Sequence, residues 1–358
     1  MRIAVLTNDY PPQSRGGAGI IADLQVRELR RRGHEVKVFT SIPEWTSKPP
    51  LVRLFRHLAD LKADRKLCED IYAWKPEMLL THNLTGCGIG TPDALKVAGI
   101  PWVHVLHDVQ LVEPSGAIVT GESFLLFRSL WRRIWSSLRR NALGNPTAVV
   151  SPTQWLIDFH RRWGLLRSSK TVVIPNPVEI EDEGRGSRLH GNDKGILFVG
   201  RLDVEKGIDV LMQAWEALGD DAPPLSLVGD GKRRAAIEAR KDPRLTVYGP
   251  QPHGHVLELM RSHAILVVPS LLIENQPTVI LEGLASGCEV IASDVGGIPE
   301  TLGDAGRIVR AGDTVALMSA LVDTMASKDL TTGREGILAR HRVDVSVGAL
   351  ESVLMSNR

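Results

Sequence analysis

Short apolar runs rich in β-branched residues alternate with longer amphipathic runs along most of the chain. In the first half, six apolar runs predict strands, at residues 2–7, 35–40, 77–82, 102–107, 148–151 and 171–175. Runs with apolar residues at helical spacing predict the helices between them, at residues 22–33, 92–99, 124–143 and 153–164. Because strands that alternate with helices form parallel sheets, this half predicts a doubly wound α/β domain.

The alternation stops in a polar, glycine-containing stretch and then starts again. Six further apolar runs predict a second parallel sheet, at residues 195–200, 225–231, 244–249, 264–270, 289–294 and 306–310. We therefore predict an N-terminal Rossmann-like domain at 1–178, a linker at 179–194 and a C-terminal Rossmann-like domain at 195–340. Residues 341–358 predict a helical segment that packs back towards the first domain. The EIEDE run in the linker predicts solvated chain rather than a metal site.

Composition is that of a globular protein, with 43% hydrophobic and 24% charged residues in a chain of 358. The three cysteines, Cys68, Cys87 and Cys288, are far apart and form no Cys-x-x-Cys pair, which argues against a disulfide framework or a structural zinc site. The first apolar run is too short for a signal peptide, and no run of about 18 apolar residues could span a bilayer. We expect a cytoplasmic protein.

The net charge of +1 conceals an uneven distribution. Residues 1–178 hold 24 lysines and arginines against 15 acidic residues, and residues 179–358 hold 19 against 27. A basic first half is typical of a domain that meets an anionic surface or ligand, although two unrelated surfaces could also differ by chance.

Two cations follow the first strand of the second sheet. Arg201 and Lys206 lie in the loop between residues 195–200 and the next predicted helix. Parallel sheets bind ligands beyond the carboxyl ends of their strands, so two cations in this loop could neutralise a polyanion. A solvated basic loop is the alternative.

The segment PSLLIENQPTVILEGLASG, residues 269–287, carries two glutamates. Pro277 suits the first turn of a helix and Gly287 its C-terminal end, so Glu274 lies in a loop and Glu282 lies inside the helix where an aliphatic residue is expected. Phosphate binds at helix N-termini, and carboxylates accept hydrogen bonds from sugar hydroxyls. Together these groups indicate a nucleotide sugar.

A third motif, SDVGGIPE at residues 293–300, follows a predicted strand. Its two glycines allow another part of the backbone to approach closely, although a plain turn would explain them equally well. Gly200-Arg201 with Lys206, the Glu-x7-Glu spacing and the GGIPE sequence together resemble the retaining family 4 glycosyltransferases of GT-B fold. The resemblance covers essentially the whole chain and implies two Rossmann-like domains that face each other across a cleft.

The resemblance also implies roles for single residues. The position of Glu282 binds the nucleotide ribose in such enzymes, and that of Glu274 contacts the donor sugar. The positions of Arg201 and Lys206 hold the diphosphate, and a histidine at a strand end, here His107, lies near the sugar. A histidine buried in the core is the alternative for His107.

Further substrate-binding positions come from two loops. The glycine loop after the first strand, with Gly16 and Gly17, approaches the donor in this family, and backbone N–H groups at such a turn can reach an anion. Many relatives have a Pro-Phe-Gly-like segment after the first glutamate, whereas this chain has Asn275, Gln276 and Pro277, followed by Thr278. Backbone amides there could still bind the donor.

The sequence thus predicts a metal-independent glycosyltransferase without a cofactor, which moves a sugar from a UDP- or GDP-linked donor to a glycan. No Asp-x-Asp motif stands at a strand end. The resemblance implies retention of configuration, with the departing phosphate deprotonating the acceptor. A dehydrogenase would need G-x-G-x-x-G after the first strand, and a P-loop motif is absent. A GT-B sugar-nucleotide epimerase and a non-catalytic nucleotide-sugar-binding relative remain alternatives.

The predicted helix at 124–143 is strongly amphipathic. Its apolar side holds Phe124, Phe127, Trp131, Ile134, Trp135, Leu138 and Ala142, and its other side holds Arg128, Arg132, Arg133, Arg139 and Arg140. Burial of the apolar side against the sheet is the ordinary arrangement. An arginine face beside aromatic residues also suits an anionic membrane, which would favour a lipid-linked saccharide or glycolipid as acceptor in cell-envelope polysaccharide synthesis.

Overall fold

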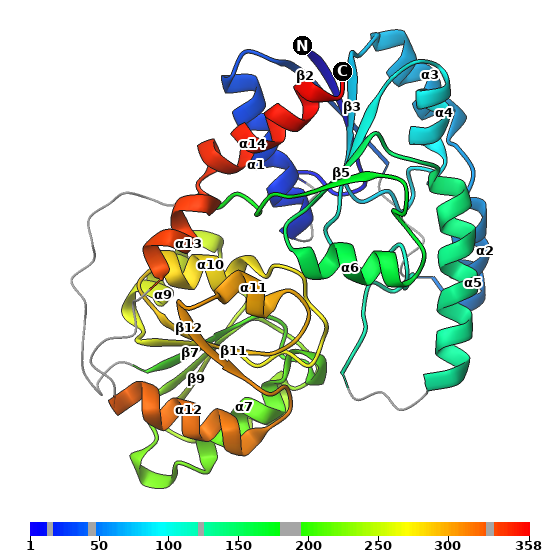
Figure 1. Cartoon of the computed structure of the whole chain (residues 1–358). Helices are drawn as coiled ribbons and strands as arrows, with labels where there is room; N and C mark the ends of the chain where they lie inside the picture. Colours follow the sequence, from blue (N-terminus) through cyan, green and yellow to red (C-terminus); the bar gives the residue numbers. More distant parts are fainter. Residues whose placement is uncertain (13–16, 42–47, 121–124, 180–194, 327–332) are drawn as a thin grey trace. The chain divides into compact units, whose positions relative to one another are not determined.

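The computed structural model describes residues 1–12, 17–41, 48–120, 125–179, 195–326 and 333–358 (Figure 1). The chain divides into two compact units. Unit 1 comprises Met1–Ala117, Glu122–Val178 and His341–Arg358, and unit 2 comprises Ile118–Gly121 and Glu179–Arg340. Each unit contains a six-stranded parallel sheet with helices packed on it, so the predicted α/β fold with two Rossmann-like sheets is confirmed.

The sheet of unit 1 has the strand order β2-β1-β3-β4-β5-β6. Its strands are β1 Arg2–Thr7, β2 Glu35–Thr40, β3 Met78–Thr81, β4 Trp102–Val105, β5 Ala148–Ser151 and β6 Lys170–Val173. Its helices are α1 Gly17–Arg31, α2 Pro50–Ala59, α3 Arg65–Trp74, α4 Thr91–Val97, α5 Leu125–Leu143, α6 Gln154–Arg162 and α14 Val343–Ser356. The central strands β3, β4 and β5 are buried along their whole length, as expected for a parallel sheet covered on both faces.

The C-terminal helix α14 belongs to unit 1 and lies beside α1 (Figure 1, red and blue). Its Val347, Leu350 and Leu354 are fully buried in one core with β1 and β3. Arg32, just after α1, donates hydrogen bonds to Glu351 and to a backbone carbonyl at the start of α14. Apolar burial and these charged contacts hold the end of the chain on the first sheet.

The sheet of unit 2 has the strand order β12-β11-β10-β7-β8-β9. Its strands are β7 Ile196–Val199, β8 Leu225–Val228, β9 Leu245–Gly249, β10 Ile265–Val268, β11 Glu289–Ser293 and β12 Gly306–Val309. Its helices are α7 Ile208–Glu216, α8 Arg234–Glu238, α9 His253–Ser262, α10 Thr278–Ala285, α11 Ile298–Leu302, α12 Thr314–Ala326 and α13 Arg334–His341, with short 3-10 helices η2 Val204–Lys206 and η3 Gly219–Asp221. Residues of α7 and α12 share one core with alternate residues of β7, β8 and β10.

Both sheets reverse their strand order at one point, and a parallel sheet opens a crevice there. In unit 1 the reversal lies between β1 and β3, and in unit 2 it lies between β7 and β10. The loops after these strands therefore meet at the carboxyl edge of each sheet, and they carry most of the residues that the sequence singles out.

Some elements differ from the sequence prediction. Helices α2 and α3 occupy a region between β2 and β3 that the apolar pattern left unassigned. The helix predicted to start at Pro277 starts at Thr278, with Pro277 as its N-cap. Of the predicted linker, residues 180–194 lie outside the described part of the chain.

Candidate active site

In unit 2, Lys206 and Glu274 form an ion pair at the point where the strand order reverses. Lys206 ends the 3-10 helix η2 in the loop after β7, and Glu274 lies in the loop after β10. The Lys206 Nζ donates a hydrogen bond of 2.8 Å to Glu274 Oε2. The second carboxylate oxygen, Glu274 Oε1, is buried and has no hydrogen-bond partner among the described residues. A buried acceptor without a partner is uncommon in a folded protein, and this one lies beside the Lys206 cation.

Backbone contacts hold these two loops together. The carbonyl of Glu205 accepts hydrogen bonds from the N–H groups of Leu271 and Leu272. Gly207 adopts φ +74°, and a Cβ there would overlap the carbonyl oxygen of Pro269. Glycine at 207 is therefore required for the close approach that brings Lys206 to Glu274.

The glycine pair of the GGIPE motif fixes the Glu274 loop from the other side. Gly297 N–H donates a hydrogen bond of 2.8 Å to the Glu274 carbonyl oxygen. Gly296 has φ +60°, and a Cβ there would overlap the same oxygen. Of the two interpretations of these glycines, close backbone approach therefore applies at Gly296, and it fixes the backbone of a candidate catalytic residue.

Helix α10 begins directly after this loop. Asn275 and Gln276 are buried and both take part in contacts within the fold, while Pro277 and Thr278 are partly exposed at the helix start. The first N–H groups of an α-helix have no partner inside the helix and carry partial positive charge. The loop that carries Glu274 leads directly into such a helix N-terminus, which is a suitable place for an anion.

Glu282 lies in the second turn of α10. The sequence suggested a buried acid, but the side chain is 17% exposed, which is partial rather than full burial. Its Oε1 lies 3.3 Å from Nε2 of the exposed His253 on α9. A partly solvated carboxylate with a histidine neighbour carries a much smaller desolvation cost than a fully buried one. The position of Glu282 therefore does not require a buried cation beside it.

Arg201 follows β7 and is mostly exposed. Its Nη1 lies 3.1 Å from Asp203 Oδ2, and Asp203 is buried and also accepts a hydrogen bond from the Lys232 backbone N–H. The structure thus pairs Arg201 with Asp203 and Lys206 with Glu274. The Arg201 guanidinium itself faces water, with its side chain 62% exposed, whereas that of Asp203 is 9% exposed.

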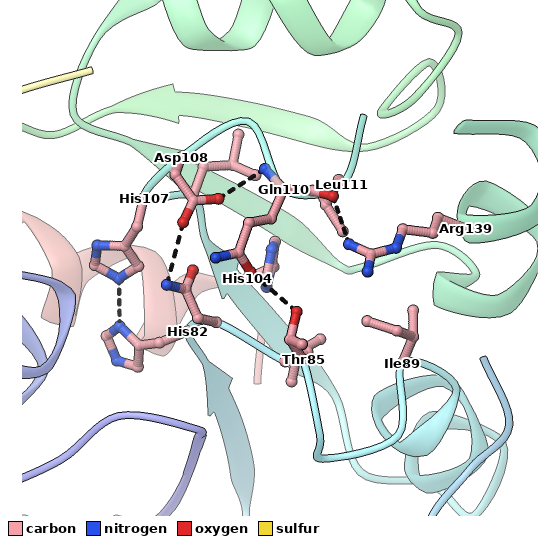
Figure 2. Close-up of a pocket in the computed structure, with 12 residues that line it drawn as sticks. His82, Thr85, Ile89, His104, His107, Asp108, Gln110, Leu111 and Arg139 are labelled. Atoms are coloured by element: carbon pink, nitrogen blue, oxygen red, sulfur yellow. Dashed lines mark hydrogen bonds between the residues drawn. The ribbon is translucent and has the colours of Figure 1, made fainter. Parts of the chain in front are cut away.

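In unit 1, His107 lies just beyond β4 beside a small cavity (Figure 2). His107 Nε2 is 2.8 Å from Nδ1 of the fully buried His82, which follows β3, and the two rings stack. Burial lowers the pKa of His107 to about 4 and the pKa of His82 well below its usual value. Both rings are therefore neutral near pH 7, so His107 can act there as a hydrogen-bonding group but not as a cation.

The same cavity is lined by a carboxylate and a buried guanidinium (Figure 2). Burial raises the pKa of Asp108 to about 6, although Gln110 N–H and Asn83 Nδ2 donate hydrogen bonds to its oxygens. Arg139 of α5 is 1% exposed and donates to the Gln110 carbonyl. Burial lowers its pKa to about 10, so it remains a cation at neutral pH.

The glycine loop after β1 is only partly described. Gly16 lies outside the described residues, and Gly17 is the exposed first residue of α1. Among the described residues, no group of three or more His, Cys, Asp or Glu side chains could hold a metal ion. Within the same residues, no helix combines the length and the apolar character needed to cross a bilayer.

Sequence reasoning missed His82, Gly207 and His253. His82 and His253 meet their partners only through tertiary contacts, and no motif surrounds them. Gly207 stood directly after Lys206, and a glycine beside a candidate cation could have been interpreted as a point of close approach.

Two family models match the chain, and together they cover most of it. The model described as Glycosyltransferase Family 4 matches residues 15–182, and the model described as Glycosyl transferases group 1 matches residues 193–327. The chain belongs to the family 4 glycosyltransferases of GT-B fold. It is therefore a glycosyltransferase.

The relatives of this glycosyltransferase include proteins of similar length. It is 26% identical to alpha-maltose-1-phosphate synthase of Mycolicibacterium smegmatis, over 96% of this chain and 94% of that one. It is 32% identical to phosphatidyl-myo-inositol mannosyltransferase of the same organism, over 53% of each chain. Its fold is similar to that of HepE from Anabaena, solved in complex with UDP, with a TM-score of 0.72 and 20% identity over 99% of this chain and all of that one.

Proposed function

We propose that this glycosyltransferase moves a sugar, with retention of configuration, from a UDP- or GDP-linked donor to a glycan. The observation that carries the proposal is the Lys206–Glu274 pair at the crevice of the second sheet, next to the start of α10. This constellation combines a cation and free helix N–H groups for a diphosphate with a carboxylate oxygen for a sugar hydroxyl. HepE, whose fold is similar, was also solved with UDP-glucose.

In the proposed donor complex, Arg201 and Lys206 bind the diphosphate, and the backbone N–H groups of Asn275, Gln276 and Thr278 support it. Glu274 accepts hydrogen bonds from the donor sugar through Oε1, which has no protein partner among the described residues. Glu282 accepts hydrogen bonds from the ribose hydroxyls. The family resemblance adds His107 near the sugar and the loop with Gly16 and Gly17 near the donor.

The proposed chemistry follows from where charge develops. The bond between the anomeric carbon and the phosphate oxygen breaks, leaving an oxocarbenium-like sugar and a nucleoside diphosphate with additional negative charge. Cations and N–H groups fixed at that charge lower the barrier. The departing phosphate oxygen takes the proton of the acceptor hydroxyl on the same face, so no protein base is assigned. The cations replace a metal ion in this scheme, in keeping with the absence of an Asp-x-Asp motif in the sequence.

For the acceptor we propose a lipid-linked saccharide or glycolipid in the synthesis of a cell-envelope polysaccharide. The mannosyltransferase relative has a phosphatidyl-inositol in its name, which supports a lipid acceptor for this chain. The three cysteines are free thiols, which supports a cytoplasmic location.

The test is a donor panel followed by a transfer assay. We expect calorimetry to detect binding of UDP or GDP and of one of their sugars, and free nucleoside diphosphate to appear only when an acceptor glycan is added. Conversion of the donor to another sugar nucleotide without an acceptor would support an epimerase instead. Donor binding without any turnover across a broad acceptor panel would support a non-catalytic relative.

A further inference from the structure

Over residues 130–143, where the structure describes its side chains, helix α5 does not bury the side that the sequence predicts, and Phe124 and Phe127 lie outside that range. Trp135, Ser136, Arg139 and Leu143 are buried, and they mark the side that faces the sheet of unit 1. The Arg139 guanidinium lies over the Trp135 ring, 5.0 Å from its centroid, and Arg132 pairs with Glu113. Two of the five arginines are therefore committed to contacts within the fold and do not form an exposed basic face.

This orientation leaves apolar side chains of α5 outside. Leu130 is 59% exposed and Ile134 is 48% exposed, and Trp131 and Leu138 are also exposed. Positions 130, 134 and 138 follow each other at intervals of four residues, so they form one stripe along the helix.

Helix α2 exposes a second apolar stripe. Leu51 is 71% exposed and Phe55 is 69% exposed, with Val52 and Leu58 also exposed. Residues 51, 55 and 58 lie on one side of the helix, whereas Leu54 and His57 are only partly exposed and mark the inner side. Large apolar side chains that gather on adjacent turns are uncommon on a protein that meets only water.

The two helices are neighbours in unit 1 (Figure 1, at the right). The His57 ring of α2 packs edge-on against Trp135 of α5, with centroids 5.8 Å apart. Trp131 in turn stacks on Trp135. The inner sides of both helices thus meet around Trp135, and each helix carries its apolar stripe away from that contact.

Arginines flank both stripes, and neither helix contains an acidic residue. Arg53 and Arg56 of α2 and Arg133 and Arg140 of α5 are exposed, and on each helix they lie to one side of the apolar stripe. All charged residues of the two helices are therefore positive, and we call the two apolar stripes together with these four arginines the α2–α5 surface. This combination suits an anionic lipid surface, where apolar side chains enter the acyl boundary and arginines bind phosphate groups.

A second copy of the chain fits this surface poorly. In a two-fold dimer the same patch meets itself, which would bring the four exposed arginines of each copy together without any acid on these helices to neutralise them. Lipid phosphates supply the missing negative charge.

We propose that the α2–α5 surface docks unit 1 on an anionic membrane through its apolar side chains, with Arg53, Arg56, Arg133 and Arg140 bound to lipid phosphates. The proposal differs from the expectation drawn from residues 124–143 alone, because α2 supplies half of the surface and Arg132 and Arg139 take no part. It goes beyond the proposed function and does not depend on the identity of the donor, whose residues lie on other elements.

The experiment measures binding of the full chain to vesicles of phosphatidylcholine with and without phosphatidylglycerol, at low and high salt. We expect binding that requires phosphatidylglycerol and weakens with salt. The double variant Leu51→Ser/Phe55→Ser and the double variant Leu130→Ser/Ile134→Ser should each weaken it by about tenfold or more. Replacing Arg53 and Arg56 by Glu should weaken it by at least about fivefold per arginine.

Matched controls come from other exposed positions of the same unit. Val97 on α4 and Arg162 on α6 are exposed, so Val97→Ser and Arg162→Glu remove an apolar side chain and a cation outside the α2–α5 surface. Both controls should bind vesicles as the unmodified protein does. Melting temperature and calorimetric affinity for UDP and GDP should be unchanged in all variants, which separates docking from folding and from the donor site.

Three results would overturn the proposal. One is failure of the unmodified protein to bind phosphatidylglycerol vesicles at low salt. Another is equal binding by the surface variants and the controls. The third is a concentration-dependent dimer, seen by sedimentation, that Phe55→Ser abolishes while vesicle binding persists, because the surface would then serve a second copy.

Discussion

Replacement of Lys206 tests whether its pair with Glu274 serves catalysis or only structure. The Lys206 side chain is 24% exposed and that of Glu274 is 15% exposed, so the pair is partly buried. Loss of one partner from a fully buried pair costs about 3–5 kcal/mol, and water access here reduces this to roughly 1–3 kcal/mol. At about 2–4 °C per kcal/mol for a domain of this size, Lys206→Ala should lower the melting temperature by several degrees.

The effect on rate should be larger than the effect on stability. Removal of one fixed charge contact to the transition state typically lowers the rate by about 10²–10³-fold. We expect Lys206→Ala and Glu274→Ala each to lose activity by about this factor while remaining folded at the assay temperature. The assay follows acceptor-dependent release of UDP or GDP, with circular dichroism as the control for folding.

A charge swap makes the two roles separable. In the double variant Lys206→Glu/Glu274→Lys the ion pair can form again, so most of the lost stability should return. Activity should not return, because the cation and the carboxylate would face the wrong parts of the donor. Recovery of both stability and activity in the swap, or turnover within about tenfold of normal in both single variants, would show that the pair is structural only.

Three further predictions concern Glu282, Gly296 and the buried histidines. Glu282→Gln should weaken UDP or GDP binding in calorimetry more than it lowers the melting temperature, whereas a purely structural acid would show the reverse. Gly296→Ala places a Cβ against the Glu274 carbonyl oxygen at a residue with φ +60°. We expect transfer activity to fall by on the order of tenfold or more, because the Glu274 loop must shift. Unchanged activity would show that the position of this loop does not matter for transfer. Thermal unfolding should show stability falling as pH drops from about 6.5 to about 4, because burial lowers the pKa of six histidines and the unfolded chain then binds more protons than the folded one. The histidines are His57, His82, His104, His107, His160 and His263. Burial raises the pKa of two carboxyls, Asp60 and Asp108, whose opposite contribution is outnumbered, and constant stability over that range would contradict the prediction.

The sequence by itself determined the two parallel sheets and the loops that carry the chemistry. The period of apolar residues identifies strands and helices, and a parallel sheet places the loops after its strands at one edge. The sequence therefore assigns Arg201, Lys206, Glu274 and His107 to the ends of strands. The family motifs then gave these positions their expected roles.

Only the tertiary structure decided which of these residues meet. Lys206 and Glu274 are 68 positions apart and pair because β7 and β10 are neighbours and because Gly207 and Gly296 allow the loops to touch. The contact of His82 with His107 and that of His253 with Glu282 likewise depend on packing between elements, which local periodicity does not encode.

The orientation of α5 shows the same limit most clearly. Helical spacing groups residues that share a side, but it does not say which side faces the sheet. The structure buries Trp135 together with Arg139, one turn apart, because the guanidinium packs over the indole ring and bonds to the Gln110 carbonyl. The assumption that every arginine faces solvent therefore assigns the wrong side of the helix to the sheet. In the structure the apolar residues at 130, 134 and 138 are on the surface.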